Sequence, residues 1–283
     1  MCFSMISDPA LQEKANKLVS ILTELGSVAV AFSGGVDSTL LLKAASLVLK
    51  ENAIAVTVTA SIVPQSEQKE ADTFCLDHKI TQIHKSFDPC ALEVFATNPP
   101  DRCYHCKKEI FSSICEIAAS HGMAYVVEGS NVDDDTDYRP GKKAIRELGV
   151  RSPLREAGLT KAEIRLLSQA LNLPTWNKPA YACLASRFVY GETITPEKLH
   201  RVELAEDFLK KQGFGQFRVR NHQNMARIEV LPDEIDRVIS LRDPIWEALT
   251  SYGFDYVTVD LKGYRTGSMN EVLRHSGSDA SKS

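Results

Sequence analysis

The spacing of apolar residues along the chain predicts helices and strands that alternate from the start. Apolar positions three or four residues apart indicate a first helix, and Gly26 ends it. These positions are Leu11, Ala15, Leu18, Val19, Leu22 and Leu25. Apolar runs at 28–32 and 53–59 predict buried strands, and the segment 38–50 between them predicts a helix. Strand, helix and strand in this order form a βαβ unit with parallel strands.

The alternation continues through the next part of the chain. We expect a helix over 66–78, a short strand at Ile83, a helix over 110–119 and a strand over 124–127. This order predicts a doubly wound, parallel α/β sheet, in which ligands bind at the carboxyl ends of the strands.

Later helix signals indicate a second, smaller domain. Thr160 and Glu163 have the spacing of a capping box. Thr195 as N-cap and Pro196 at the first helical position open another helix, which Gly213 ends. The elements predicted after it are strands over 217–220 and 226–230, a helix around 246–249 and a strand over 256–259. The predicted organisation is an α/β domain over 1–190, a small C-terminal α+β domain over 191–268 and a disordered polar tail over 269–283.

Composition excludes several classes of protein. Apolar residues make up 43% and charged residues 25% of the 283 residues, as in ordinary globular proteins. No apolar run approaches a membrane span, and residues 1–7 lack the length and basic start of a signal peptide. The net charge of -4 gives no support for a protein whose surface as a whole binds nucleic acid. We expect a cytoplasmic protein without membrane or nucleic-acid partners, whose seven cysteines are reduced thiols, metal ligands or reactive groups.

The strand at 28–32 ends in a Ser-Gly-Gly turn that leads directly into the next helix. Backbone N–H groups at such a helix N-terminus point into one small space and form an anion site. Glycines permit close approach there, and serine hydroxyls add hydrogen-bond donors. The residues expected to bind the anion are Ser33, Gly34, Gly35, Asp37 and Ser38.

The segment Ser33–Ser38 resembles the SGGxDS signature of the PP-loop ATP pyrophosphatases, which hold the β and γ phosphates of ATP and release pyrophosphate. It is not a Walker loop, because no GK[ST] follows the glycines. The resemblance implies attack on the α phosphate, which gives an adenylylated substrate. Asp37 is then expected to help hold the Mg²⁺ of ATP, directly or through water.

A loop rich in acidic residues, 128–141, follows the fourth predicted strand. One interpretation is a solvated acidic loop without function. The other follows from its place at the carboxyl end of a strand, where its carboxylates could hold Mg²⁺ and Arg139 could meet a phosphate. Glu128 and Asn131 are further candidates for nucleotide binding in this loop.

Three cysteines stand out from the seven. Cys103 and Cys106 form a C-x-x-C pair at the start of a helix, which is typical of a redox pair, half a zinc site or part of an iron–sulfur site. Cys183 lies near Lys178 and Arg187, which can lower a thiol pKa, although a packed small residue fits equally well. The cysteines left without a chemical role are Cys2, Cys75, Cys90 and Cys115.

Several motifs are distributed over almost the whole chain: Ser33–Ser38, Asp137–Gly141, Trp176–Lys178, Ser186–Phe188 with Tyr190–Gly191, and Arg218–Arg220. Together they resemble the LarE family of PP-loop sulfur transferases, which make the nickel-pincer nucleotide cofactor. The resemblance implies that ATP adenylylates a carboxylate of a pyridinium mononucleotide, and that sulfur then replaces the activated oxygen to give a thiocarboxylate. It also implies a homo-oligomer.

Members of this family differ in their source of sulfur. One type sacrifices a cysteine in the Trp-Asn-Lys segment and has no C-x-x-C pair, but here Ala182 stands in the position of that cysteine and Cys183 follows one residue later. The other type holds a [4Fe–4S] cluster with three cysteines, which in this chain are Cys103, Cys106 and Cys183. The resemblance therefore favours a cluster whose open iron accepts sulfide, from free HS⁻ or a donor protein. Ser186 and Arg187 are expected to border the reacting carboxylate.

Arg218 and Arg220 alternate on one face of a predicted strand, so both guanidinium groups can reach one anion. The resemblance suggests a phosphate of the substrate or nucleotide, and the alternative is a solvated strand face. Three rival functions remain at this point. They are a PP-loop tRNA thiolase, an amide-forming synthetase that uses ammonia, and a nucleotide-binding module with a structural zinc site.

Overall fold

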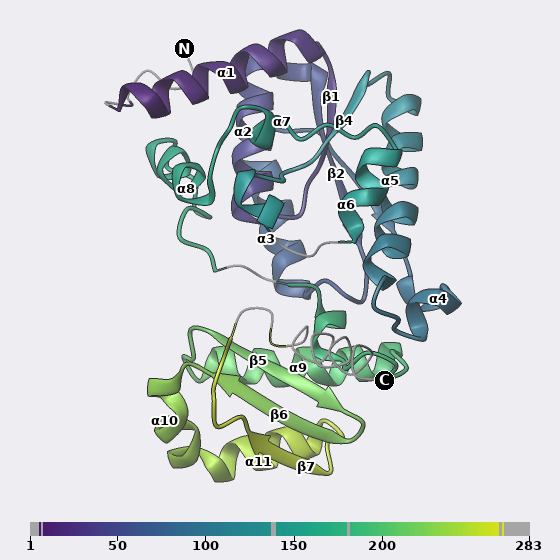
Figure 1. Ribbon diagram of the computed structural model, residues 1–283, viewed down its shortest axis with the longest axis vertical. Helices are drawn as coiled ribbons and strands as arrows, with labels where there is room; N and C mark the ends of the chain where they lie inside the picture. Colours follow the sequence, from purple (N-terminus) through teal and green to yellow (C-terminus); the bar gives the residue numbers. More distant parts are fainter. Residues whose placement is uncertain (1–5, 7, 137–139, 180–181, 266–267, 269–283) are drawn as a thin grey trace, which may run out of the picture. The chain divides into compact units, whose positions relative to one another are not determined.

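The computed structural model describes residues 6, 8–136, 140–179, 182–265 and 268. The chain divides into two compact units (Figure 1). The first comprises Met1–Pro89 and Asp101–Tyr181, and the second comprises Cys90–Pro100 and Ala182–Ser283. The chain therefore passes between the units three times, after residues 89, 100 and 181. The predicted tail over 269–283 lies outside the described residues.

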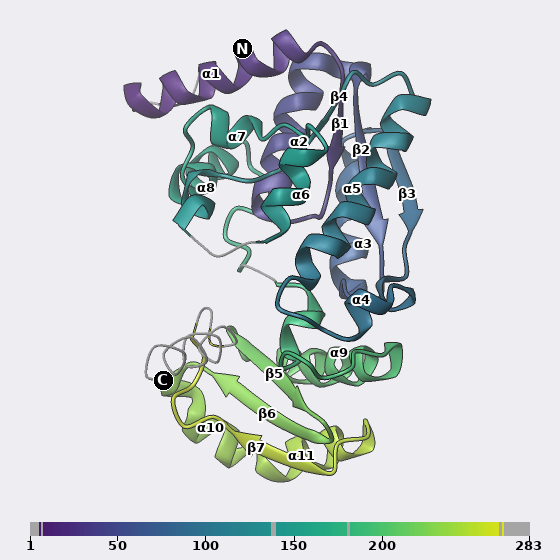
Figure 2. The same cartoon turned by 45° about the vertical axis from the view of Figure 1, so that its right-hand side comes forward.

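A four-stranded parallel sheet forms the centre of the first unit (Figure 2). Its strands, in the order β3-β2-β1-β4, are β3 (Gln82–Ser86), β2 (Ala53–Thr59), β1 (Val28–Ala31) and β4 (Tyr125–Val127). Side chains alternate between the two faces of each strand. Val28 and Val30 of β1 pack into one buried cluster, whereas Ala29 packs into another on the opposite face. Both faces of the sheet are therefore covered.

Helices cover the two faces of this sheet (Figure 2). The cluster with Val28 and Val30 contains residues of α1 (Pro9–Leu25), α2 (Val36–Leu49), α3 (Gln65–Asp77), α7 (Pro153–Glu156) and α8 (Lys161–Ala170). The cluster with Ala29 contains residues of α5 (Arg102–Ser120) and α6 (Gly141–Glu147). This arrangement confirms the predicted doubly wound parallel α/β sheet. None of the described helices combines the length and hydrophobicity needed to cross a membrane.

The second unit contains a small mixed sheet, β5-β6-β7, in which β5 and β6 are antiparallel and β6 and β7 are parallel. The strands are β5 (Phe217–His222), β6 (Met225–Val230) and β7 (Tyr256–Val259). The helices are α4 (Glu93–Ala96), α9 (Pro196–Lys211), α10 (Ile235–Ser240) and α11 (Arg242–Ser251), with a 3₁₀ turn, η4, over Leu184–Arg187. The predicted small α+β domain is therefore present as a fold.

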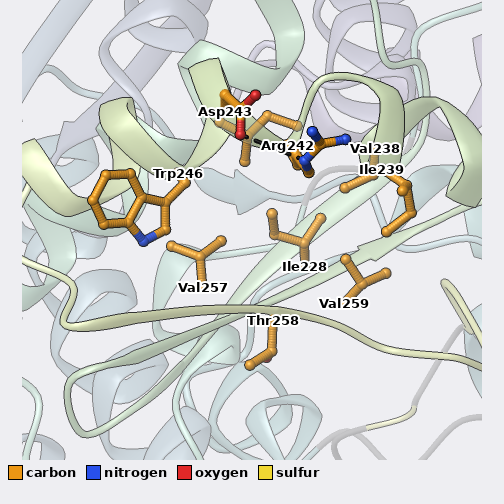
Figure 3. A pocket seen from close by; sticks show the side chains of 10 residues that line it. Ile228, Val238, Ile239, Arg242, Asp243, Trp246, Val257, Thr258 and Val259 are labelled. Carbon is orange, nitrogen blue, oxygen red and sulfur yellow. Dashed lines mark ion pairs between the residues drawn. The ribbon is translucent and has the colours of Figure 1, made fainter.

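An apolar pocket of about 490 Å³ lies in the second unit, between the sheet and the helices α10 and α11 (Figure 3). Ile228 and Val259 line it from the strands, and Val238 and Trp246 line it from the helices. No residue that the sequence nominated for the functional site is among the described residues around this pocket.

Helix α5 begins eight residues earlier than its apolar spacing predicts. Its first turns are polar and carry Arg102, Cys103 and Cys106, so the apolar period becomes visible only from Ile110. The capping box of α8 forms as predicted: the Thr160 side chain accepts from the Glu163 N–H, and the Glu163 carboxylate accepts from the Thr160 N–H at 2.8 Å.

Candidate functional site

The turn between β1 and α2 has the geometry of an anion-binding loop. Gly34 has φ of +69°, and a Cβ at this position would lie 3.2 Å from the Cβ of Ala71. The Ser38 hydroxyl donates to the Gly35 carbonyl and lies 3.0 Å from the Ser33 hydroxyl. Glycine and two linked hydroxyls thus set the shape of this loop, at the N-terminus of a helix of 14 residues.

Asp37 lies in the first turn of α2, and side chains from two other elements bind its carboxylate. Asn131 Nδ2 donates to Oδ1 at 3.1 Å. Lys161 Nζ lies 2.5 Å from Oδ2 and forms an ion pair with it. Asn131 follows β4, and Lys161 is the first residue of α8. The structure therefore brings together two predicted residues, Asp37 and Asn131, and adds a lysine.

The end of β4 packs directly against the start of α2. A Cβ on Gly129 would lie 3.0 Å from the Ser38 backbone nitrogen and 3.1 Å from the Asp37 Cβ, so only glycine fits here without a shift. Glu128, by contrast, accepts hydrogen bonds from the Ser130 N–H and hydroxyl and from the Ser152 hydroxyl. Its carboxylate is buried and shapes the loop, and its predicted contact with nucleotide stays a prediction.

Helix α8 also fixes the Trp-Asn-Lys segment of the first unit. Arg165 donates to the carbonyls of Trp176 at 2.6 Å and Lys178 at 2.8 Å. Lys178 in turn donates to the Gly34 carbonyl at 3.1 Å and pairs with Glu70 at 2.7 Å. The segment that leads to Cys183 is therefore attached to the phosphate loop.

The predicted cysteines are distributed over both units. Cys103 is exposed in the first turn of α5 and Cys106 is buried one turn later, whereas Cys183 is exposed in the second unit. Within the described part of the chain, no three Cys, His, Asp or Glu side chains form a group that could hold a metal ion. The spacing of Cys103 and Cys106 places their thiols on one side of the helix.

Arg187 holds the turn that follows Cys183. Its guanidinium makes two hydrogen bonds to the Glu206 carboxylate, at 2.8 and 2.7 Å, and donates to the carbonyls of Ala182 and Cys183 and to the Ser186 hydroxyl. Arg187 is 1% exposed. Glu206, on α9, also accepts from the Val219 N–H of β5 at 2.9 Å. Arg187 thus positions Cys183 and Ser186 from a buried site.

Arg218 and Arg220 are buried on β5 beside this turn. Arg220 pairs with Glu229 and donates to the Ser186 carbonyl at 2.8 Å. Burial lowers the pKa of the Arg218 guanidinium, and the neighbouring positive charge of Arg187 lowers it further. The structure therefore gathers Ser186, Arg187 and both predicted strand arginines within the second unit.

Comparison with known proteins identifies the family. A protein of Lactiplantibacillus plantarum named pyridinium-3,5-bisthiocarboxylic acid mononucleotide synthase is 40% identical over 264 residues, which cover 93% of this chain and 96% of that protein. The chain belongs to the LarE family.

Two uncharacterised proteins are similar over comparable lengths. One, from Synechocystis, is 43% identical over 93% of this chain and 99% of its own length. The other, from Methanocaldococcus jannaschii, is 30% identical over 84% of this chain and 91% of its own length. No protein-family model matches the chain. The named relative is a synthase, which confirms the prediction that this LarE-family chain is an enzyme.

Sequence reasoning missed three groups of this LarE-family site, Gly129, Lys161 and Lys178. Gly129 lay in the acidic loop 128–141 but was not nominated itself, and Lys178 belonged to the Trp-Asn-Lys motif but was given no role beyond that of a neighbour of Cys183. Lys161 carried one signal, because a lysine at the first position of a helix faces the positive end of the helix dipole. In the structure the Asp37 carboxylate offsets this unfavourable position. The predicted phosphate contact Arg139 lies outside the described residues.

Proposed function

We propose that this chain is an ATP-dependent sulfur transferase that converts a carboxylate of a pyridinium mononucleotide into a thiocarboxylate, in the biosynthesis of a nickel-pincer cofactor. The observation that carries the proposal is the 40% identity to the named synthase over 93% of the chain. A carboxylate oxygen is a poor leaving group, so its replacement by sulfur requires activation. Adenylylation by ATP supplies that activation.

The phosphate loop supports ATP as the activating substrate. The N–H groups at the start of α2 and the hydroxyls of Ser33 and Ser38 provide donors for the β and γ phosphates. Gly34 lets the loop pack closely against Ala71, and Gly129 lets the end of β4 pack closely against the start of α2, where a Cβ would collide. Held in this way, the nucleotide leaves its α phosphate open to attack by the substrate carboxylate, and pyrophosphate departs.

Asp37 is our choice for the contact with Mg²⁺, directly or through water, since oxygen ligands suit this ion. Arg218 and Arg220 are our choice for a phosphate of the mononucleotide or of ATP. Burial, and after it the charge of Arg187, lowers the pKa of the Arg218 guanidinium, and a bound anion would stabilise its charged form.

The activity test uses the purified chain with Mg·ATP and a pyridinium-3,5-dicarboxylic acid mononucleotide. We expect pyrophosphate release that depends on the mononucleotide, and replacement of oxygen by sulfur in the substrate when sulfide is supplied. Gly34→Val should abolish pyrophosphate release, because this position has φ of +69° and Ala71 lies against it. Gly215→Ala is the control, since a Cβ at Gly215 meets no atom within 4 Å. Absence of pyrophosphate release from the wild-type chain would contradict the proposal.

For the sulfur source we propose a [4Fe–4S] cluster held by Cys103, Cys106 and Cys183, which would supply an exchangeable sulfide. The resemblance suggests this ligand set, and the donor chemistry fits it. Two thiols one helical turn apart serve one cluster well, and the Cys183 thiol is exposed beside a turn that Arg187 holds. Thiolate ligands of this kind also fit the reducing cytoplasm, our proposed location. The homo-oligomer remains a prediction.

Iron and acid-labile sulfide analysis of anaerobically purified protein tests the cluster. We expect about four irons per chain, as in other [4Fe–4S] proteins, and loss of the cluster in Cys183→Ala. Cys115→Ala is the matched control, because Cys115 is a half-buried cysteine on α5 that lies far along the helix from Cys103. Stoichiometric zinc in the wild-type protein would contradict the cluster and favour a structural zinc site.

A further inference from the structure

The phosphate loop is joined to α8 by a closed ring of four hydrogen bonds. Asn131 Nδ2 donates to Asp37 Oδ1 at 3.1 Å, and the Asp133 N–H donates to Asn131 Oδ1 at 2.9 Å. The Lys161 N–H donates to Asp133 Oδ2 at 2.8 Å. The Lys161 ammonium then closes the ring on Asp37 Oδ2 at 2.5 Å.

The four links differ in how easily they break. The first three use backbone groups or short side chains, so breaking any of them moves the β4 loop or α8 itself. The N-terminus of α8 is further fixed by Thr160, Glu163 and the ion pair from Lys14 to Glu163 at 2.7 Å. The fourth link uses a flexible lysine side chain, and its two partners are 30% and 24% exposed. Only this link can exchange while the loop keeps its shape.

The Asp37 carboxylate is also the group that the proposed function assigns to the contact with Mg²⁺. A divalent ion that binds Asp37 directly must displace the Lys161 ammonium, because like charges repel across so short a distance. A free metal ion offers no other partner for the displaced ammonium. A nucleotide triphosphate does, since its phosphates bring negative charge to the N-terminus of α2.

We propose that Lys161 is a positioning residue that keeps free divalent cations off Asp37 until a nucleotide arrives, and that its ammonium then moves from Asp37 to the phosphates. The metal therefore enters only together with the nucleotide. This inference rests on the proposed use of Mg·ATP. Lys161 thus lowers the affinity of the protein for the metal ion alone and raises its affinity for the metal–nucleotide complex.

The test measures Mn²⁺ binding by electron paramagnetic resonance, with the metal alone and with an ATP analogue that carries a methylene group between the α and β phosphates. Lys161→Met should bind Mn²⁺ alone about tenfold or more tightly than wild type, and the Mn²⁺–analogue complex about tenfold or more weakly, as expected for loss of one charge-assisted contact. Lys161→Arg keeps the charge and should exclude free Mn²⁺ as wild type does. Lys14→Met is the matched control, because it removes a lysine that pairs with the same helix but does not contact Asp37.

The outcomes separate this inference from the proposed function. Equal affinity of wild type and Lys161→Met for free Mn²⁺ would overturn the exclusion of the metal. Unchanged affinity of Lys161→Met for the Mn²⁺–analogue complex would overturn the transfer to phosphate. Failure of wild type to bind the analogue at all would instead count against ATP as substrate, while the measurement with Mn²⁺ alone still reports on the ion pair.

Discussion

The buried pair of Arg187 and Glu206 allows a quantitative prediction about the second unit. Glu206→Ala removes the carboxylate that accepts two hydrogen bonds from Arg187 and one from the Val219 N–H. The guanidinium, 1% exposed, would then stay buried without this counter-charge. Breaking one side of a buried ion pair costs about 3–5 kcal/mol of unfolding free energy. For a chain of this size, that loss lowers the melting temperature by roughly 10 °C.

Urea unfolding can follow the second unit alone, because the two tryptophans are divided between the units: Trp176 in the first and Trp246 in the second. In a Trp176→Phe background, fluorescence reports on Trp246. Arg242→Ala is the control, since its ion pair with Asp243 is 71% and 77% exposed and such pairs contribute less than about 1 kcal/mol. A loss below about 1 kcal/mol in Glu206→Ala would refute the reasoning, because the buried charge would then be compensated elsewhere.

Three further predictions concern single residues. Gly129→Ala should lower the affinity for the ATP analogue, measured by calorimetry. By overpacking it should also lower the unfolding free energy by about 1–3 kcal/mol, measured by urea titration. Unchanged values would show that β4 shifts freely to make room for the methyl group. Burial raises the pKa of Cys75 to about 12. In N-ethylmaleimide labelling of cluster-free protein at about pH 8, followed by mass spectrometry, the exposed Cys103 and Cys183 should therefore react before Cys75, and equal rates would contradict the burial. Burial lowers the pKa of His222 below 6.5, so its protonation favours the unfolded chain and stability should fall as pH drops below that value. His222→Gln should flatten this fall in unfolding free energy, and an unchanged pH profile would argue against it.

Most of the fold follows from local patterns. The strands β2 and β7 have the predicted bounds, because a buried apolar run between polar turns specifies a strand by itself. The glycines and hydroxyls of the phosphate loop are also contiguous in sequence, so their motif is visible. Only the Cys103 and Cys106 pair, predicted to open a helix, indicated the early start of α5, because its first turns present polar residues such as Lys107 and show no apolar period.

The remaining parts of the site depend on contacts between distant residues. Asn131 could be nominated from its place after a strand, but its bond to Asp37 arises only when β4 lies beside β1. Lys161 and Glu206 each act through a partner on another element. Single-sequence patterns describe neighbours along the chain, so they carry no record of such pairs.

The division of the chain into interleaved units has a consequence for the order in which it is synthesised. Segment 90–100 belongs to the second unit, and its Asn98 side chain donates to the Val189 carbonyl at 2.7 Å. The Asn98 carbonyl accepts from the Gly191 N–H, and the Ala96 carbonyl accepts from the Ile194 N–H. During synthesis on the ribosome, segment 90–100 emerges before α5 to α8. It can therefore form these hydrogen bonds only after those helices and residues 189–194 have emerged. A C-terminal fragment that starts at residue 182 would lack these partners. The second unit therefore needs segment 90–100, from the middle of the chain, to form.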